Sequence, residues 1–199
     1  MINPNSFWVL YGQHTEPTFH ENAQGGQQQQ RDHALTYVKR WRSCVDIGSN
    51  IGQWTRPLAK NFKKVYCFEP NPNFRECFEK NINESNVQLF PYGLSDSNHK
   101  GHQEFNSTQI TEGDGDIECR TLDSFQLTDL DFVKIDVDGF EIPLLKGASE
   151  TLTQNTPVIN IEMKRGKRPD VVRVAEKILR KLGYKFKKAV KSDEVWLKR

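Results

Sequence analysis

The sequence predicts an α/β domain with a doubly wound, mostly parallel sheet, and three observations carry this prediction. Apolar segments of strand length alternate with amphipathic segments of helix length from residue 34 onward. Several of the expected strands, such as KVYCF and VINI, are apolar on both faces, which is typical of parallel strands covered by helices on either side. The last two expected strands follow each other without a helix between them, so we expect the chain to end in an antiparallel hairpin at one edge of the sheet.

The expected elements follow this alternation along the chain. The strands cover residues 43–48, 64–70, 87–94, 131–137 and 158–163, and the helices cover residues 35–42, 51–61, 71–82, 139–152 and 169–182. Pro57 falls inside the second helix, where we expect it to cause a kink. Two further pairs of segments are expected to form hairpins: residues 101–106 with 116–122, and residues 185–191 with 194–199.

The N-terminal residues 1–33 lack a regular pattern and are expected to form an extension or lid beside a main domain of residues 34–199. Residues 23–32 are rich in Gly and Gln, which predicts a loop or mobile segment. Residues 7–10, FWVL, are too apolar for a free tail, so we expect them to pack on the domain or over a site.

Composition favours a single soluble domain. The length of 199 residues suits one domain, and no run approaches the ~18 apolar residues of a membrane span. The start of the chain, MINPNSFWVL, lacks the features of a secretory signal, so a cytoplasmic protein without a membrane partner is expected. The cysteines form no metal-like or CxxC spacing, and we expect all of them to be reduced: Cys44, Cys67, Cys77 and Cys119.

The charge is unevenly distributed. Residues 164–199 contain 14 Lys and Arg against 4 Asp and Glu, a net charge of +10, although the whole chain carries only +2. Such a region can bind an anionic partner such as nucleic acid. It can equally be a solvated helix face followed by lysine-protected edge strands.

The first regular strand leads into a glycine-containing loop, VDIGSNIG. Glycines allow the backbone to approach a ligand, and this strand, loop and helix arrangement is typical of nucleoside binding. The spacing differs from the GxGxxG of NAD-dependent dehydrogenases. Asp46, inside the strand end, would be unfavourable beside a pyrophosphate but suits a ligand that carries a cation there, such as the α-ammonium group of S-adenosylmethionine.

The second strand ends in another acid, Glu69, which lies 23 residues after Asp46. An acid at this position accepts hydrogen bonds from ribose hydroxyls and would repel the 2′-phosphate of NADP. The two acids and the glycine loop together therefore favour an adenosyl cofactor.

Carboxylates also crowd the end of the strand in FVKIDVDGFEIPLLKG. Ligands of open α/β sheets bind beyond the carboxyl ends of the strands, so Asp136 and Asp138 are expected beside the reactive end of the cofactor. Buried carboxylates are unfavourable unless they are paired or used, and Asp136 is the stronger functional candidate. The alternative for Asp138 and Glu141 is that they cap the following helix.

These segments together resemble the FkbM-type family of class I S-adenosylmethionine-dependent methyltransferases. The resemblance covers about residues 33–163 and rests on VDIGSNIG, FEPNP, LFPYGLSD, RTLDSF and FVKIDVDGFEIPLLKGA, in this order. It implies a Rossmann-like fold and a methyltransferase domain over residues 34–199. The cofactor-binding positions that it implies are Asp46, Gly48, Ser49, Asn50, Gly52, Glu69, Pro70, Asn71, Tyr92, Gly93 and Leu94. Asp138 departs from the pattern, because the family more often has Glu there.

The resemblance implies O-methylation of a hydroxyl group on a sugar or small natural product. Asp136 is then the candidate general base and Asp138 its support. A divalent metal held by Asp136, Asp138 and Glu162 is left open, since hard cations favour carboxylates.

Two alternatives to this function remain at this point. The first is an RNA 2′-O-methyltransferase, with the basic C-terminal region binding nucleic acid and a catalytic set of Lys39, Asp136, Lys164 and Glu194. The second is a non-catalytic binding module that retains the fold.

Overall fold

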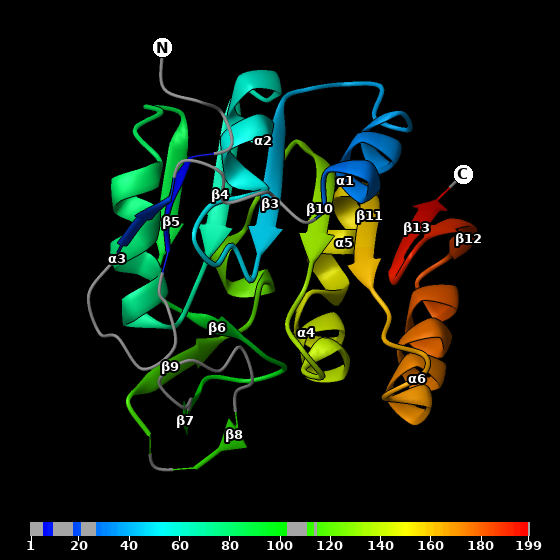
Figure 1. Ribbon diagram of the computed structural model, residues 1–199. Coiled ribbons are helices and arrows are strands. Elements are labelled where there is room, and N and C mark those ends of the chain that lie inside the picture. Colours follow the sequence, from blue (N-terminus) through cyan, green and yellow to red (C-terminus); the bar gives the residue numbers. More distant parts are fainter. Residues whose placement is uncertain (1–5, 10–17, 21–26, 103–110, 114, 199) are drawn as a thin grey trace.

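A seven-stranded, mostly parallel sheet forms the centre of the computed structural model, which describes residues 6–9, 18–20, 27–102, 111–113 and 115–198 (Figure 1). The strand order is β12-β13-β11-β10-β3-β4-β5. The parallel strands are β3 (Ser43–Ile47), β4 (Lys64–Phe68), β5 (Val87–Phe90), β10 (Leu130–Ile135) and β11 (Val158–Glu162). The hairpin of β12 (Tyr184–Val190) and β13 (Asp193–Lys198) adds antiparallel to β11, as predicted.

Helices cover both faces of this sheet, and the result is a doubly wound, Rossmann-like α/β fold. Successive residues of β3 point to opposite faces, so Cys44 packs in one core cluster and Val45 in the other. The Cys44 face is covered by α1 (Gln28–Leu35), α2 (Thr55–Asn61) and α3 (Pro72–Asn81). The Val45 face is covered by α4 (Glu141–Gly147), α5 (Ser149–Asn155) and α6 (Pro169–Lys181).

Two small sheets accompany the central one (Figure 1). The first has the order β6-β9-β7-β8, from β6 (Gly93–Leu94), β7 (His99–His102), β8 (Thr111–Glu112) and β9 (Ile117–Arg120), and the 3-10 helix η1 (Asp123–Phe125) follows it. The antiparallel pairing of β7 with β9 confirms that the inserted segments pair, although residues 103–106 of the predicted hairpin lie outside the described residues. The second sheet pairs β1 (Phe7–Val9) with β2 (Thr18–His20).

The first predicted helix, over residues 35–42, is wrong in position. The helix is α1, which ends at Leu35, and residues 28–32 of the segment predicted to be a loop lie inside it. Trp41 instead packs on Phe62, with ring centroids 4.9 Å apart, and its carbonyl accepts a hydrogen bond of 3.1 Å from Lys63 N. These tertiary contacts accompany a turn at residues 36–37 and an irregular connection from there to β3 in place of the predicted helix.

Three further boundaries differ from the prediction. Helix α2 begins only at Thr55, so Pro57 lies in its first turn, where the missing N–H breaks no helical hydrogen bond and causes no kink. The strand predicted over residues 87–94 is interrupted at Pro91, and its second half joins the small sheet as β6. The helix predicted over residues 139–152 is divided at Ala148 into α4 and α5.

Gly147, next to this division, permits a close backbone contact. A Cβ atom there would lie 1.9 Å from the carbonyl oxygen of Ser95. Only glycine therefore allows α4 to approach the chain after β6, and this explains the glycine in the sequence LKGA, residues 145–148.

All four cysteines are buried and free, as predicted. Within the described residues, no helix is long and apolar enough to cross a membrane.

Candidate active site

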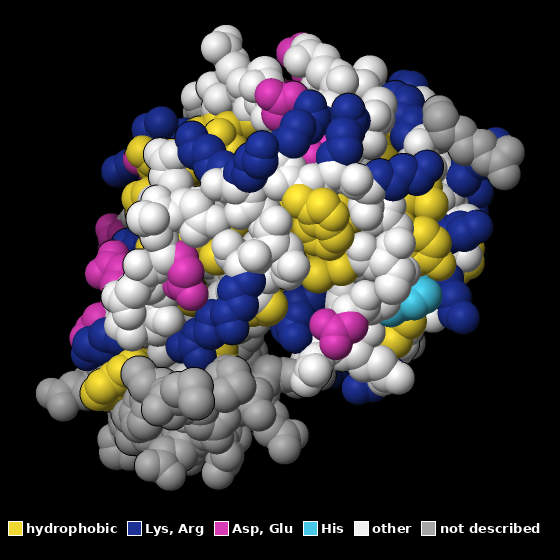
Figure 2. Space-filling model, turned by 90° about the horizontal axis from the view of Figure 1, so that it is seen from above, with side chains coloured by type: hydrophobic (Ala, Val, Ile, Leu, Met, Phe, Trp, Pro, Cys, Tyr) yellow, Lys and Arg dark blue, Asp and Glu magenta, His cyan; other side chains and the backbone are white. Residues whose placement is uncertain are grey.

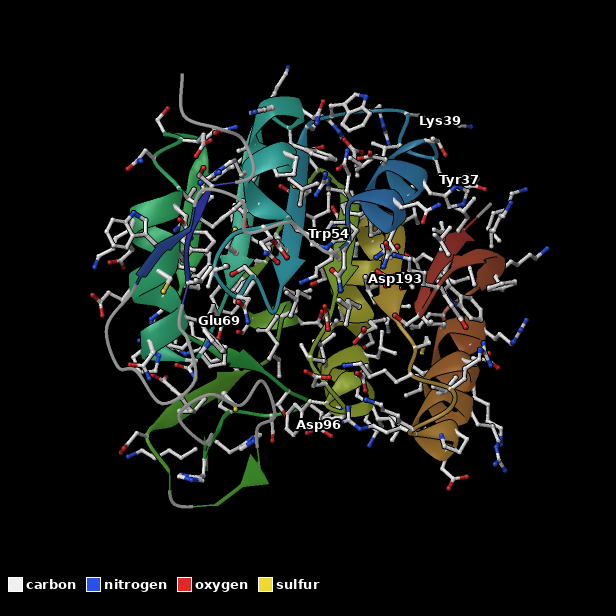
Figure 3. All side chains as sticks on the ribbon, in the orientation of Figure 1. Tyr37, Lys39, Trp54, Glu69, Asp96 and Asp193 are labelled. Carbon is white, nitrogen blue, oxygen red and sulfur yellow. The ribbon has the colours of Figure 1, made fainter. Side chains whose placement is uncertain are left out.

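A cavity of about 400 Å³ opens where β3, β4, β10 and β11 end. This is the edge at which ligands of open α/β sheets bind. Its walls consist of Gln27, Ile47, Gly48, Ser49, Asn50, Gln53, Trp54, Phe68, Glu69, Pro70, Tyr92, Gly93, Leu94, Lys134, Asp136, Val137, Asp138, Phe140, Glu162 and Lys164. Figure 3 shows Glu69 below the end of β4 at this edge.

The glycine loop forms one wall of the cavity. Gly48 has a φ of +71°, and a Cβ atom there would lie 1.9 Å from the carbonyl oxygen of Asp136. Glycine is therefore required where the loop meets the end of β10. The amides of Gly48 and Ser49 both donate to the carbonyl of Phe68, at 3.0 and 3.1 Å. The buried hydroxyl of Ser49 has no hydrogen-bond partner among the described residues, so a ligand in the cavity can satisfy it.

Two of the predicted cofactor residues support this wall from behind. Gly52 has a φ of +90°, and a Cβ atom there would lie 2.6 Å from Cγ1 of Ile82. Asn71 caps α3, where its side chain accepts a hydrogen bond of 2.9 Å from Asn73 N. Neither residue belongs to the cavity wall, so the structure gives them a role in holding the loops.

Asp46 also lies behind the wall, in a buried ion pair. Its Oδ1 is 3.2 Å from Nζ of Lys134, and its Oδ2 accepts a hydrogen bond of 2.7 Å from Thr55 Oγ1. Lys134 in turn donates to the carbonyl of Gly48 at 2.6 Å. Burial would lower the pKa of Lys134, but the carboxylates of Asp46 and Asp136 outweigh it and raise that pKa. The lysine therefore stays charged and ties the end of β3 to β10.

Glu69 faces the cavity from the end of β4. Each of its carboxylate oxygens accepts one backbone N–H at 2.9 Å, from Asn50 and from Asn71. Its residue exposure is only 3%, and burial raises the pKa of the carboxyl to about 7 although these N–H groups oppose the shift. The remaining lone pairs of the carboxylate are free to accept hydrogen bonds from the two hydroxyls of a ribose.

Aromatic and apolar residues line the cavity beyond Glu69. Phe68 stacks on Phe90 with ring centroids 4.9 Å apart, and Phe125 meets both edge-on. Tyr92, whose ring lies under the guanidinium of Arg120 at 4.0 Å, completes this side together with Pro70, Gly93 and Leu94. An apolar and aromatic surface beside a buried acid such as Glu69 can accommodate a purine base.

Asp136 lies at the opposite end of the cavity and is held by the N-terminal part of the chain. Its Oδ2 accepts a hydrogen bond of 3.1 Å from Nε2 of Gln27. Oε1 of the same glutamine accepts a hydrogen bond from the indole N–H of Trp54. One glutamine side chain thus connects the helix layer to the candidate base.

Asp136, Asp138 and Glu162 meet as a cluster of carboxylates, with one oxygen of each lying within 4.8 Å of the others. Lys164 bonds to Asp138 and lies 2.9 Å from Glu162, and Ser192 Oγ donates to Glu162 at 3.2 Å. Burial and the charge of Asp136 raise the pKa of Glu162 to about 7, while Lys164 opposes the shift. The ammonium of Lys164 therefore already supplies positive charge to this cluster.

Lys164 also affects whether a divalent metal can bind to these carboxylates, a question that the sequence left open. Carboxylate oxygens are suitable ligands for a hard divalent cation, but two of the three carboxylates already bind the Lys164 ammonium. A cation would have to displace this side chain, so the arrangement does not fit a resident metal.

Comparison with known proteins identifies the family. Residues 46–186 match the methyltransferase FkbM domain. The chain belongs to the FkbM methyltransferase family. The hexuronic acid methyltransferase AglP of Haloferax volcanii is 29% identical over 139 residues, which are 62% of this chain and 56% of the relative. The chain thus spans about half the length of this curated relative.

Solved structures share the fold of this FkbM domain. The FkbM methyltransferase of Methylobacillus flagellatus has a TM-score of 0.60 at 17% identity, over 81% of this chain and 45% of that one. A precorrin-6y C5,15-methyltransferase of Geobacter metallireducens has a TM-score of 0.56 at 16% identity, over 85% and 86% of the two chains. At such identities the likeness shows the fold alone.

The residue set expected of an RNA 2′-O-methyltransferase is not brought together. Asp136 and Lys164 line the cavity, but Lys39 lies toward the opposite end of the molecule from Glu69 (Figure 3). Glu194 is buried outside the cavity wall, where it accepts a hydrogen bond of 2.8 Å from Arg165 Nε.

Glu141 is the first residue of α4, and no side chain of the described residues caps this helix by a hydrogen bond at its N-terminus. The carboxylate of Glu141 instead accepts a hydrogen bond of 2.9 Å from the backbone N–H of Gly139, ahead of the helix, and burial raises its pKa. Asp138, which precedes this turn with a φ of +49°, lines the cavity instead.

Several residues of the cavity wall were missed as site residues from the sequence, among them Gln27, Trp54 and Lys134. Gln27 lies in a Gln-rich segment without periodicity, so nothing distinguished it from its neighbours. Lys134 did carry a signal, because a lysine inside an apolar strand needs a buried acid as its partner.

Proposed function

We propose that this protein transfers the methyl group of S-adenosylmethionine to a hydroxyl group of a sugar. The observation that carries the proposal is a single cavity with a nucleoside-binding wall at Ser49 and Glu69 and a carboxylate, Asp136, at its other end. Membership of the FkbM methyltransferase family supports the choice of cofactor.

The cofactor side of the cavity provides binding groups. S-adenosylmethionine, when bound, would supply a methyl group on a sulfonium, which is already activated for transfer. Glu69 accepts hydrogen bonds from the ribose hydroxyls. The hydroxyl of Ser49, which no other described residue bonds, binds a polar group of the amino acid part. Tyr92, Gly93 and Leu94 then lie against the base.

The acceptor side provides orientation and a proton acceptor. Asp136 accepts the proton of the acceptor hydroxyl, whose oxygen would take the methyl group while the carbon–sulfur electron pair of the bound S-adenosylmethionine would remain on sulfur. Gln27 fixes the rotamer of Asp136, and Asp138 and Glu162 are placed beside it by Lys164. Positioning and proton transfer are the contributions that a protein makes to such a displacement.

A sugar is the favoured acceptor because the curated relative at 29% identity is named a hexuronic acid methyltransferase. A small natural product is the other acceptor class that the family resemblance implies. The N-terminal segment, residues 1–33, acts as a lid on this acceptor side in our proposal, since Gln27 reaches Asp136 from it. Residues 34–199 then form the catalytic domain.

The direct test is transfer of a labelled methyl group from S-adenosylmethionine into cell extract separated into glycan, RNA and small-molecule fractions. We expect label in the glycan fraction with the wild-type protein and none with Asp136→Asn. Label in the RNA fraction would replace the proposal by the RNA alternative, and label in a small-molecule fraction alone would replace the sugar by a natural product.

A further inference from the structure

A second hollow of about 480 Å³ adjoins the cavity on the side of β11. It lies between the loop after β11 and the turn that joins β12 to β13, which meet because Glu162 of β11 pairs with Asp193 of β13. Its charged lining residues are Lys164, Arg165, Lys167, Lys191 and Glu194. Four cations therefore face one anion in this hollow.

The two hollows share a wall. The side chain of Lys164 lines both of them. Ser192 lines the second hollow and donates to Glu162, which lines the first. The second hollow therefore lies directly next to the Asp136 end of the cavity, across Lys164.

The cations of the second hollow differ in their availability. Lys164 and Arg165 already form ion pairs, Arg165 with Glu176 and Glu194. Lys167 and Lys191 are exposed, and neither forms an ion pair with another described residue. These two ammonium groups are thus free to meet an anion from outside.

The backbone at Lys191 is also unusual. Its φ of +54° lies in the left-handed region, which glycine or asparagine adopts more easily than lysine. Lys191 therefore lines the hollow from a backbone conformation that is unfavourable for a lysine.

Charge is reversed at the reacting end of the cavity. There Asp136, Asp138 and Glu162 meet the single ammonium of Lys164, so a second anion would be repelled beside them. An uncharged hydroxyl suits this end, and a negatively charged group suits the hollow next to it. The cavity volume of about 400 Å³ is in the lower part of the ~300–1,000 Å³ range of small-molecule sites, so an acceptor beside a bound cofactor has to extend outward.

We propose that the second hollow is a subsite for the anionic group, a carboxylate or a phosphate, of an acidic sugar acceptor whose uncharged hydroxyl faces Asp136. This proposal rests on the sugar methyltransferase function proposed above. It assigns Lys167 and Lys191 to acceptor recognition and not to the methyl transfer itself.

A site-specific test is needed because Lys and Arg side chains are not confined to this region. Figure 2 shows many of them on the face seen from above, where Asp and Glu are less frequent. A general attraction of anions to the protein would therefore not locate the subsite. The charge-matched control is Lys60→Gln with Lys177→Gln, two exposed lysines of α2 and α6 that line neither hollow.

The test compares the binding of glucuronic acid, glucose 6-phosphate and glucose to the protein saturated with S-adenosylhomocysteine, by saturation-transfer NMR. We expect at least one acidic sugar to bind more tightly than glucose. The Lys167→Gln/Lys191→Gln variant should bind this acidic sugar about 3- to 30-fold more weakly, because two exposed charge contacts are lost. Its affinity for glucose should not change. The two acidic sugars distinguish a carboxylate from a phosphate. The control variant should behave as wild type.

Equal binding of acidic and neutral sugars, or equal losses in the variant and its control, would overturn the subsite. Selective loss of binding to an RNA oligonucleotide, with no acidic sugar bound, would also overturn it in favour of a nucleic acid partner. An acidic-sugar preference that depends on these lysines supports the subsite even if no sugar is methylated, and in that case the failure lies in the proposed function.

Discussion

Asp46 and Lys134 are register partners on the adjacent parallel strands β3 and β10, and the two buried side chains form an ion pair with Oδ1 and Nζ 3.2 Å apart. The lysine also donates to the carbonyl of Gly48 at 2.6 Å. Asp46 of β3 therefore has a cation of the protein beside it, and it acts on the glycine loop through Lys134. The expected contact of Asp46 with the α-ammonium of the cofactor stays a prediction.

Breaking this pair should destabilise the fold strongly. Lys134→Met leaves the carboxylate of Asp46 buried without its cation, and we expect a loss of about 3–5 kcal/mol in the free energy of unfolding, measured with urea. Combining it with Asp46→Asn should recover part of this loss, because the remaining uncompensated charge is removed. Additive losses in the double variant would show that the two side chains are not coupled.

Glu69 should make cofactor binding depend on pH. Its pKa in the folded protein is about 7, and ribose hydroxyls donate to the ionised carboxylate. The affinity for S-adenosylhomocysteine should therefore fall below pH 7, by up to about tenfold per pH unit, in calorimetric titrations. Glu69→Gln should weaken binding and remove this part of the pH dependence. A wild-type affinity that is constant from pH 5.5 to pH 8 (about one to one and a half units on either side of this pKa) would refute the ribose contact.

The same group should affect the stability of the free protein with a defined sign. The folded pKa of Glu69, about 7, is above the ordinary value of 4.5, so the folded state binds the proton more tightly. The stability that this proton contributes is fully present below about pH 4.5 and is lost as the pH rises through about 7. The difference in unfolding free energy between wild type and Glu69→Gln should follow this course in urea titrations at several pH values.

The sequence predicted the sheet well because its central strands β3, β10 and β11 are buried almost throughout and bounded by polar turns. Strands β3, β4, β10 and β11 and the closing hairpin all lie within the predicted segments or one residue beyond them. The errors in the predicted element boundaries were confined to short segments, and tertiary contacts caused them. Residues 36–42 have a helical pattern, but Trp41 packs against Phe62, and Gly147 lets α4 end against Ser95, which no periodicity reveals.

The proposed cofactor side of the site was predictable to a greater extent than the proposed acceptor side. Gly48 and Glu69 follow strands directly, so their place at the sheet edge follows from the order of elements. Gln27 and Lys164 reach Asp136 and Asp138 from segments that are remote in sequence. Side chains that meet only after the helices have packed leave no spacing signal in the chain.

Asp136 should be essential for transfer but not for cofactor binding. Asp136→Asn keeps the shape of the side chain and removes the charge that accepts the hydroxyl proton. We expect the rate of methyl transfer to fall by about 10²–10⁴-fold, the usual contribution of a general base. The affinity for S-adenosylhomocysteine should change by less than ~1 kcal/mol, because the ribose contact lies at Glu69. Asp170→Asn, an exposed residue of α6, is the matched control.

Gln27 should be a positioning residue for Asp136. Gln27→Ala removes the hydrogen bond of 3.1 Å to the carboxylate and the contact with Trp54, and we expect kcat to fall about tenfold, the lower value for a hydrogen bond to a charged group. The neighbouring exposed Gln28→Ala should have no effect. In the background of Asp136→Asn, Gln27→Ala should cost little more, because the two side chains act together. Equal effects in both backgrounds would mean that Gln27 serves only the packing of the N-terminal segment.

Lys164 should make methyl transfer independent of a divalent metal. Its ammonium lies between Asp138 and Glu162, where a metal would otherwise be held, so a chelator such as EDTA should leave the wild-type rate unchanged. Lys164→Met removes this charge from a cluster of three carboxylates whose oxygens lie within 4.8 Å of one another. Their repulsion should then raise the pKa of Glu162 further and lower the rate at pH 7, while added Mg²⁺ should restore part of it. A wild-type rate that disappears with EDTA and returns with Mg²⁺ would show instead that a metal displaces Lys164 in the working enzyme.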